Sequence, residues 1–336
     1  MRTRKGIAAT ALAATLCVGM IAGLALGSSF MPVDRVLAAL ASEGSRADTI
    51  IIWNLRMPRM LMAVLAGAAL AVAGTLLQRT TRNPLAAPSV LGIVDGAALG
   101  VLLFLWWFSN EANALTVPIL WQPLAAIAGA GALSGTVAVL WWREMHDPMR
   151  LILYGVALAA LANAVVVLMI IAGPIFRASQ ALIWLAGSVH LAKWWDVQLM
   201  ALALAVLVVP LIAVTRPFDQ MRLDDQSAQS TGLPVAAYRA IGLLLSVLLT
   251  AIAVSLVGGI GFVGLIAPHL ARLLFGTAIH QQLLGAATIG AIMILGADLL
   301  VRLAFAPLEV PAGALTALIG APYFLFILVK KGAVHA

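Results

Sequence analysis

The chain has 336 residues, of which 63% are hydrophobic and 10% are charged. Soluble domains contain about 45–50% apolar and about 25% charged residues, so this composition excludes an ordinary soluble fold. The formal net charge of +7 does not indicate a nucleic-acid partner, because the sequence has no stripe of Lys and Arg residues with interleaved aromatic residues.

Long apolar runs recur along the chain and predict membrane-spanning helices. About 17–25 apolar residues cross a bilayer as a helix, and lipid offers the backbone no hydrogen-bond partners, so only helices or closed barrels span it. Because the runs are long and unbroken, we predict an all-α polytopic membrane protein with one transmembrane domain over residues 1–336 and about ten spans. The predicted spans are centred near Met20, Ala69, Val101, Ala130, Val165, Leu204, Leu248, Leu265, Ile292 and Leu318.

The first apolar run follows Arg2, Arg4 and Lys5. It reaches about Phe30 without a clear small-x-small cleavage site, so an uncleaved span is favoured over a signal peptide. Cys17, the single cysteine, lies within this run, which excludes a disulfide framework and a cysteine-based metal site. We therefore expect no bound metal.

The connections between the runs carry unequal numbers of Lys and Arg residues. If the N-terminus is cytoplasmic, most basic residues fall on the cytoplasmic side, as the positive-inside rule requires. With about ten crossings the C-terminus, with Lys330 and Lys331, returns to the same side. We predict a multi-pass protein of the bacterial inner membrane with both termini in the cytoplasm.

Two arginines, Arg56 and Arg59, flank Pro58 directly before the second span, on its outer side. Pro58 restricts the backbone, so both guanidinium groups flank a rigid helix start. Guanidinium groups placed in this way can bind carboxylates of a partner in a forked geometry. Anchoring of the helix at the membrane interface is the alternative interpretation.

Two proline-interrupted stretches, residues 83–88 and 264–269, are separated by an odd number of predicted spans. An odd offset relates two halves of a chain by inverted topology, and broken helices at matching positions often mark a transport route. We therefore place a candidate translocation route at Asn83, Pro84, Pro88, Asn163, Gly261, Pro268 and His269.

The longest cytoplasmic connection in this topology covers residues 216–239 and contains a predicted short helix. Asp224 or Asp225 can cap its N-terminus, Gly232 suits its C-terminal stop, and Pro234 prevents continuation. Such a helix, parallel to the membrane, can dock a cytoplasmic partner. A solvated connector is the alternative.

Familiar enzymatic motifs do not explain this sequence. Residues 259–264 match GxGxxG, but they follow an apolar run and lack an acidic residue about 20 positions on, which favours a close helix contact over dinucleotide binding. The sequence has no GxxxxGK[ST], HExxH or GxSxG motif. We therefore expect a non-enzymatic chain that binds no cofactor, with any ATP hydrolysed elsewhere.

Two aspartates fall within or beside apolar runs, where a charge is costly. Arg302 follows Asp298 by one helical turn, which predicts a structural ion pair rather than a proton relay. Asp95 has no such partner in the sequence, and both interfacial solvation and a functional role remain open for it.

Four stretches carry a resemblance to a known family: LRMPR at residues 55–59, TRNPLAAPSVLGI at 81–93, GFVGLIAPHLAR at 261–272, and the long run at 297–328. With them, the chain resembles the FecCD-type permeases, which are importer subunits for ferric siderophores, ferric citrate, heme and cobalamin. The resemblance covers nearly the whole chain. It implies the ten-span architecture of a type II ABC importer permease.

The resemblance also implies partners. Two permease subunits, identical or different, would flank one route, with two cytoplasmic ATPase subunits that use ATP and Mg²⁺ below and a periplasmic substrate-binding protein above. Binding-protein docking would fall on Arg56, Arg59 and Arg302. ATPase coupling would fall on the segment 216–239, at Leu223, Asp224, Asp225, Gln226, Ala228, Gly232 and Leu233.

One departure affects the coupling segment, because the family usually has glycine where Asp224 stands and leucine where Thr231 stands. We expect the local contacts with the ATPase to differ there. His190, Trp184 and Trp195 are further candidates for cargo contacts, although aromatic residues also gather at membrane interfaces for positional reasons.

The function that the resemblance implies is import of an iron(III) chelate by alternating access. The stretch at 185–197 and the NPLAAPSVLGI run favour the ferric siderophore or ferric citrate type. A heme or cobalamin permease of the same family is the first alternative. A secondary transporter driven by protons through Asp95 or Asp298 and a membrane enzyme with an unrecognised site are the others.

Overall fold

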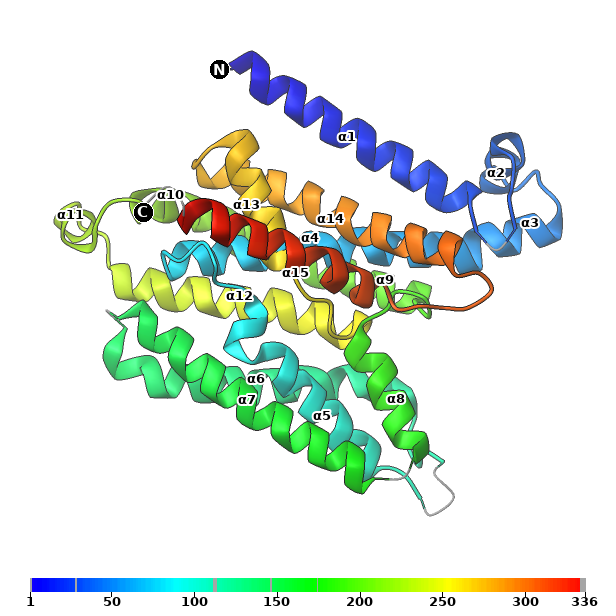
Figure 1. Ribbon diagram of the computed structural model, residues 1–336. Coiled ribbons are helices and arrows are strands. Elements are labelled where there is room, and N and C mark those ends of the chain that lie inside the picture. The colour runs from blue at the N-terminus through cyan, green and yellow to red at the C-terminus, as the bar shows by residue number, and fades with distance from the viewer. Residues whose placement is uncertain (1, 28, 111–113, 146, 174, 333–336) are drawn as a thin grey trace.

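The computed structural model describes residues 2–27, 29–110, 114–145, 147–173 and 175–332. Within these ranges the long helices run side by side in a bundle, and no strand is formed beyond one isolated bridge between Ser109 and Leu115 (Figure 1). The prediction of an all-α polytopic chain is confirmed.

Ten helical stretches of the described residues are apolar enough to serve as spans. Seven have full spanning length: Arg4–Ala25 in α1 (Arg2–Ala25), Arg46–Thr80 through α3 (Arg46–Ile50), the π-helix η1 (Ile51–Arg56) and α4 (Met57–Thr80), Ile119–Glu144 around α6 (Gln122–Trp141), α7 (Pro148–Ala172), α9 (Trp194–Ala213), α12 (Val235–Val257) and α14 (Ile279–Ala304). Three are shorter: α5 (Ile93–Trp107), α13 (Val263–Phe275) and Ala312–Phe326 in α15 (Ala312–Gly332). Every predicted span centre lies in one of these stretches.

Shorter elements connect the spans. They are α2 (Val33–Leu40), η2 (Pro88–Leu91), α8 (Ile175–Ala186), α10 (Thr215–Gln220) and α11 (Asp225–Ser230). The short helices η3 (Ile119–Trp121) and η4 (Trp142–Glu144) extend the span around α6 at its two ends. The start of α1, the end of α15 and α11 lie at one end of the bundle, and α2 and α3 lie at the other (Figure 1). Both ends of the described chain therefore return to one side, as the even number of spans predicts.

The centre of the bundle is α4, which packs against α14, α12 and α13. A Cβ placed on Gly67 would lie 2.2 Å from the carbonyl oxygen of Gly290, and a Cβ on Gly290 would lie 2.2 Å from that of Gly67. Lipid tails are as apolar as the helices, so close approach of small residues, rather than the hydrophobic effect, associates helices in a membrane. The α4–α14 contact is built in this way.

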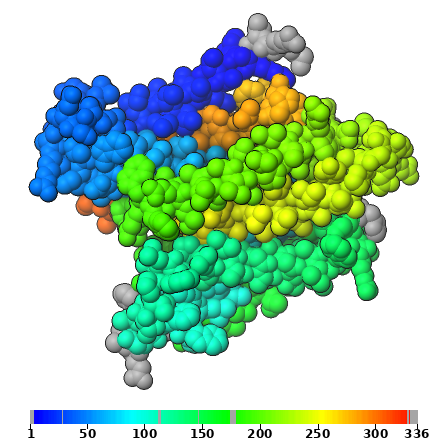
Figure 2. Space-filling model, turned by 180° about the vertical axis from the view of Figure 1, so that it is seen from behind, coloured from blue at the N-terminus to red at the C-terminus, as the bar shows by residue number. Residues whose placement is uncertain are grey.

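The outward faces of the peripheral helices are apolar. The face seen in Figure 2 carries α9, in green, and its large side chains Leu202, Val206, Val209 and Ile212 are exposed. A single isolated chain leaves these faces uncovered, whereas lipid or another membrane subunit covers them without loss of hydrogen bonds.

Candidate functional site

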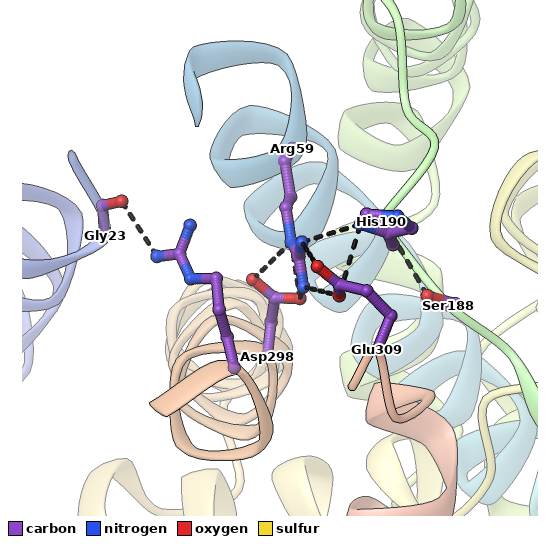
Figure 3. Close-up of polar contacts among 7 residues, drawn as sticks. Gly23, Arg59, Ser188, His190, Asp298 and Glu309 are labelled. Atoms are coloured by element: carbon purple, nitrogen blue, oxygen red, sulfur yellow. Dashed lines mark hydrogen bonds and ion pairs between the residues drawn. The ribbon is translucent and has the colours of Figure 1, made fainter. Parts of the chain in front are cut away.

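A buried ion pair joins two helices at the end of the bundle that carries α2 and α3 (Figure 3). Arg59 Nη2 lies 2.8 Å from Asp298 Oδ1, and Arg59 Nε donates to the two carboxylate oxygens at 2.9 and 3.0 Å. The two side chains are 8% and 4% exposed. Several charge-assisted hydrogen bonds fix orientation as well as distance, so this pair holds α4 and α14 together at this end.

Two more accessible side chains complete the cluster. Arg59 Nη2 lies 3.1 Å from Glu309 Oε2, and Arg59 Nη1 lies 2.8 Å from His190 Nδ1. His190 Nδ1 also lies 3.2 Å from Glu309 Oε2, and the two side chains are 38% and 41% exposed. A neutral Nδ1 accepts from Arg59, whereas a protonated Nδ1 donates to Glu309. Whether Nδ1 carries a hydrogen, which the tautomer alone can change, therefore decides which neighbour His190 binds.

The other two arginines of the predicted docking set contact the end of α1. Arg56 donates to the carbonyl oxygens of Leu24, Ala25 and Ser29 at 2.5, 3.0 and 2.6 Å, and Arg56 is 5% exposed. Arg302 Nη2 donates to the carbonyl oxygen of Gly23 at 2.9 Å (Figure 3). Gly23 and Leu24 lie in the last turn of α1, where a helix leaves carbonyl groups without partners within the helix, and these arginines satisfy them.

The predicted pairing of Asp298 with Arg302 is wrong. Asp298 is in an ion pair, as expected, but its partner is Arg59 from another span, because Arg302 is drawn to the end of α1. The prediction relied on the spacing of Asp298 and Arg302 along one helix. The tertiary contact of α4 with α14 instead places Arg59 beside the carboxylate. Glu309 was missed because it lies in the connection after α14, with no periodic pattern around it.

At the opposite end, the predicted short helix of the coupling segment is present as α11. Asp224 is its N-cap, and its carboxylate accepts from the backbone N–H of Ser227 at 2.9 Å. These bonds from the side chain and backbone of Ser227 lower the pKa of the Asp224 carboxyl. Gly232 has φ +83°, the left-handed conformation that ends a helix without a Cβ penalty.

The residues of this segment divide into exposed and anchoring groups. Asp225 pairs with Arg82 at 2.8 Å and with Arg239 at 2.9 Å, which fixes α11 to the connection after α4 and to α12. Ala228 in α11 and Leu233 after it are buried. The exposed members are Leu223, Asp224, Gln226 and Gly232.

The two proline-interrupted stretches meet in the structure. Asn83, Pro84 and Pro88 lie between α4 and α5, whereas Gly261, Pro268 and His269 lie just before and within α13. A Cβ placed on Gly264 would lie 3.0 Å from the ring of Pro88, so the two stretches are in contact. Asn163, the remaining predicted route residue, is exposed on α7 and hydrogen bonds the side chain of Asp95 on α5.

Comparisons with known proteins agree with this arrangement. The family model described as the FecCD transport family matches residues 15–330. The Probable siderophore transport system permease protein YfhA of Bacillus subtilis is 41% identical over 93% of this chain and 91% of its own length. The Fe(3+)-citrate import system permease protein YfmE of Bacillus subtilis is 38% identical over 94% and 93% of the two chains.

A solved structure is also similar along its whole length. It is a chain of an ABC transporter assigned to the metal-chelate type, in an inward-facing conformation. The TM-score is 0.84 at 27% sequence identity, and the match covers 96% of this chain and 98% of that chain.

Proposed function

Because this chain belongs to the FecCD transport family, we propose that it imports an iron(III) chelate of the ferric siderophore or ferric citrate type. It is a multi-pass transport subunit with the type II ABC importer permease fold, rather than an enzyme. The observation that carries the proposal is the match over residues 15–330, which includes the later part of the first span and all the spans after it, together with relatives that are named as siderophore and ferric citrate permeases.

Coupling to ATP hydrolysis is assigned to α11. Its exposed residues Leu223, Asp224, Gln226 and Gly232 form the surface offered to a cytoplasmic ATPase, and Asp225, Ala228 and Leu233 hold the helix in place. A push on a helix anchored by two ion pairs is transmitted to α12 through Arg239 and toward α4 through Arg82. That transmission is the step that rocks the spans between outward-open and inward-open states.

Docking of a periplasmic binding protein is assigned to the opposite end, over Arg56, Arg59 and Arg302. Arg59 is the member with an exchangeable partner, because Glu309 is 41% exposed whereas Asp298 is 4% exposed. A carboxylate of the binding protein replaces Glu309 on Arg59 without breaking the buried pair. Arg56 and Arg302 hold the end of α1 that frames this surface.

The assembly follows from these two assignments. The end with α11 and both chain termini faces the cytoplasm across the inner membrane, and a second permease subunit, identical or different, completes the route. In the proposed route, Asn163 on α7 contacts Asp95 on α5 through a polar interaction. The route also includes the residues of the two proline-interrupted stretches: Asn83, Pro84, Pro88, Gly261, Pro268 and His269.

The deciding experiment reconstitutes the complete complex in sealed vesicles and compares ferric citrate, ferric siderophores, heme and cobalamin as cargo. We expect uptake of a ferric chelate that requires ATP and an ATPase subunit competent for hydrolysis. Uptake of heme or cobalamin in preference to every ferric chelate would overturn the cargo assignment. Uptake that persists without ATP and collapses with the proton gradient would overturn the coupling assignment.

A further inference from the structure

A cationic cavity lies at the end of the bundle that carries α11, and of the residues described above only Arg82 and Pro84 line it. Its volume is about 320 Å³, and it opens between the ends of α4 and α13, the start of α14 and the stretch after α10. Its polar lining consists mainly of four arginines and two glutamines: Arg79, Arg82, Arg222, Arg272, Gln78 and Gln282.

Two of these guanidinium groups are held by neutral acceptors alone. Arg79 Nη2 donates to the carbonyl oxygen of Thr277 at 2.7 Å and to Gln282 Oε1 at 3.1 Å. Arg272 Nη2 donates to Gln78 Oε1 at 3.0 Å. Among the described residues, no carboxylate lies within ion-pair distance of either group. The glutamines that hold them are 3% and 2% exposed, whereas Arg79 and Arg272 are half-buried, so the two guanidinium groups are positioned by buried side chains.

Two carboxylates near this end of the bundle, Asp225 and Asp219, have other partners. Asp225 pairs with Arg82 and Arg239 at 2.8 and 2.9 Å, and Asp219 Oδ1 accepts from the backbone N–H of Ile279 at 2.9 Å. Arg79 is attracted by Asp219 and repelled by Arg272 and Arg222. Like charges in a partly dehydrated site repel strongly because the local dielectric constant is low. An added anion relieves this repulsion.

The geometry selects the chemical class of that anion. The planar fork of a guanidinium matches a phosphate group with two parallel hydrogen bonds. Basic pockets between transmembrane helices on the cytoplasmic side bind anionic lipid headgroups. The cavity lies near the lower limit of small-molecule sites, about 300–1,000 Å³, which suits a compact anion rather than a bulky chelate.

We propose that this cavity binds a phosphate-bearing anion, supplied by an anionic phospholipid headgroup or by free phosphate, with Arg79 and Arg272 as its main ligands. The site has a direct connection to α11. Arg82 lines the cavity, donates to the carbonyl oxygens of Met221 and Leu223, and pairs with Asp225. A bound anion competes with Asp225 for Arg82, so occupancy changes how firmly α11 is held.

The test uses the full chain, purified without phosphate, and compares it with the double variant R79Q/R272Q. R143Q is the matched control, because Arg143 is an exposed arginine in η4, outside the cavity lining. One arm places each protein in nanodiscs of phosphatidylcholine with or without phosphatidylglycerol. The other arm adds inorganic phosphate to the detergent-solubilised proteins. Thermal unfolding, lipid adducts in native mass spectrometry and amide exchange of α11 are measured.

We expect the unaltered chain and R143Q to bind the anion at least tenfold more tightly than R79Q/R272Q, with a higher unfolding temperature and altered exchange in α11. A shift with phosphatidylglycerol alone assigns the site to a lipid headgroup, and a shift with inorganic phosphate as well assigns it to free phosphate. If R79Q/R272Q binds both probes as the unaltered chain does, the proposal is wrong. It is also wrong if neither probe binds the unaltered chain. R79K/R272K, which keeps the charge but not the fork, should bind weakly and guards against misfolding of the glutamine variant.

Discussion

Arg59 and Asp298 lie 239 positions apart in the chain and form a buried ion pair of 2.8 Å between α4 and α14. The pair lies beside the surface to which we assign binding-protein docking, and beneath the more exposed Glu309. A structural contact and a proposed partner contact therefore share one guanidinium group. Variants of its two carboxylate partners should separate these roles.

Loss of the inner carboxylate should destabilise the chain. D298A leaves Arg59 buried without its main counter-ion, and breaking a buried pair on one side costs roughly 3–5 kcal/mol. We expect a clearly lower unfolding temperature in detergent for D298A and a small change for E309Q, since Glu309 is partly exposed. Equal unfolding temperatures for D298A and the unaltered chain would contradict the structural role of the pair.

Loss of the outer carboxylate should strengthen docking. E309Q removes the internal competitor for Arg59 while keeping the shape of the side chain. We expect E309Q to bind the cognate binding protein severalfold more tightly. We also expect substitution of His190 to change this affinity less in E309Q than in the unaltered chain. The affinity is measured as binding of the binding protein to the permease complex, which is immobilised on a surface in nanodiscs. H190Q on its own serves as the comparison, and weaker docking of E309Q would count against an exchangeable carboxylate.

Methyl groups at the α4–α14 contact should be poorly tolerated. In G290A the added Cβ would meet the backbone of Gly67 at 2.2 Å, and overpacking of this kind costs about 1–3 kcal/mol. Gly131 in α6 is the matched control, because nothing lies within 4 Å of its added Cβ. We expect G131A to be neutral or slightly stabilised through its higher helix propensity. Thermal unfolding of both variants gives the comparison.

Release of α11 from its anchors should uncouple transport from ATP hydrolysis. D225N removes the ion pairs with Arg82 and Arg239 while leaving the exposed surface of α11 in place. We expect severalfold less uptake per ATP hydrolysed in the reconstituted complex. D147N, which changes a carboxylate at the same end of the bundle, should keep the normal ratio. An unchanged ratio in D225N would show that the anchors are dispensable.

The stabilisation of α11 by its Asp224 cap should be lost at low pH. Bonds from Ser227 lower the pKa of the Asp224 carboxyl below its ordinary value of about 3.9. Because the pKa is lower in the folded state, the ionised carboxylate stabilises the fold at any pH above the ordinary pKa. This stabilisation is lost as the pH falls through the lower pKa of the folded state. We expect amide exchange in α11 to be faster in D224A than in the unaltered chain near neutral pH. The difference should disappear in acid, and a difference that grows in acid would refute this cap.

Local features of the site were predictable. An aspartate cap and the stop at Gly232 follow from residue types at fixed offsets, and the structure selects Asp224 from the two predicted caps, Asp224 and Asp225. The partner of Asp298 was not predictable in this way. One-turn spacing favoured Arg302, but the carboxylate is reached by Arg59 from a span far away in the sequence. The cavity around Arg79 and Arg272 likewise has no signature along the chain, because its walls come from separate helices.

The sequence by itself determined the number, positions and helical nature of the spans. In lipid each span must satisfy its own backbone hydrogen bonds, so composition and run length suffice to define it. Only the tertiary structure decided which charges meet and which remain without a counter-ion. Those contacts depend on the rotation and depth at which helices pack, and that packing is set by backbone approach at small residues such as Gly67 and Gly290 rather than by any pattern local to the charges.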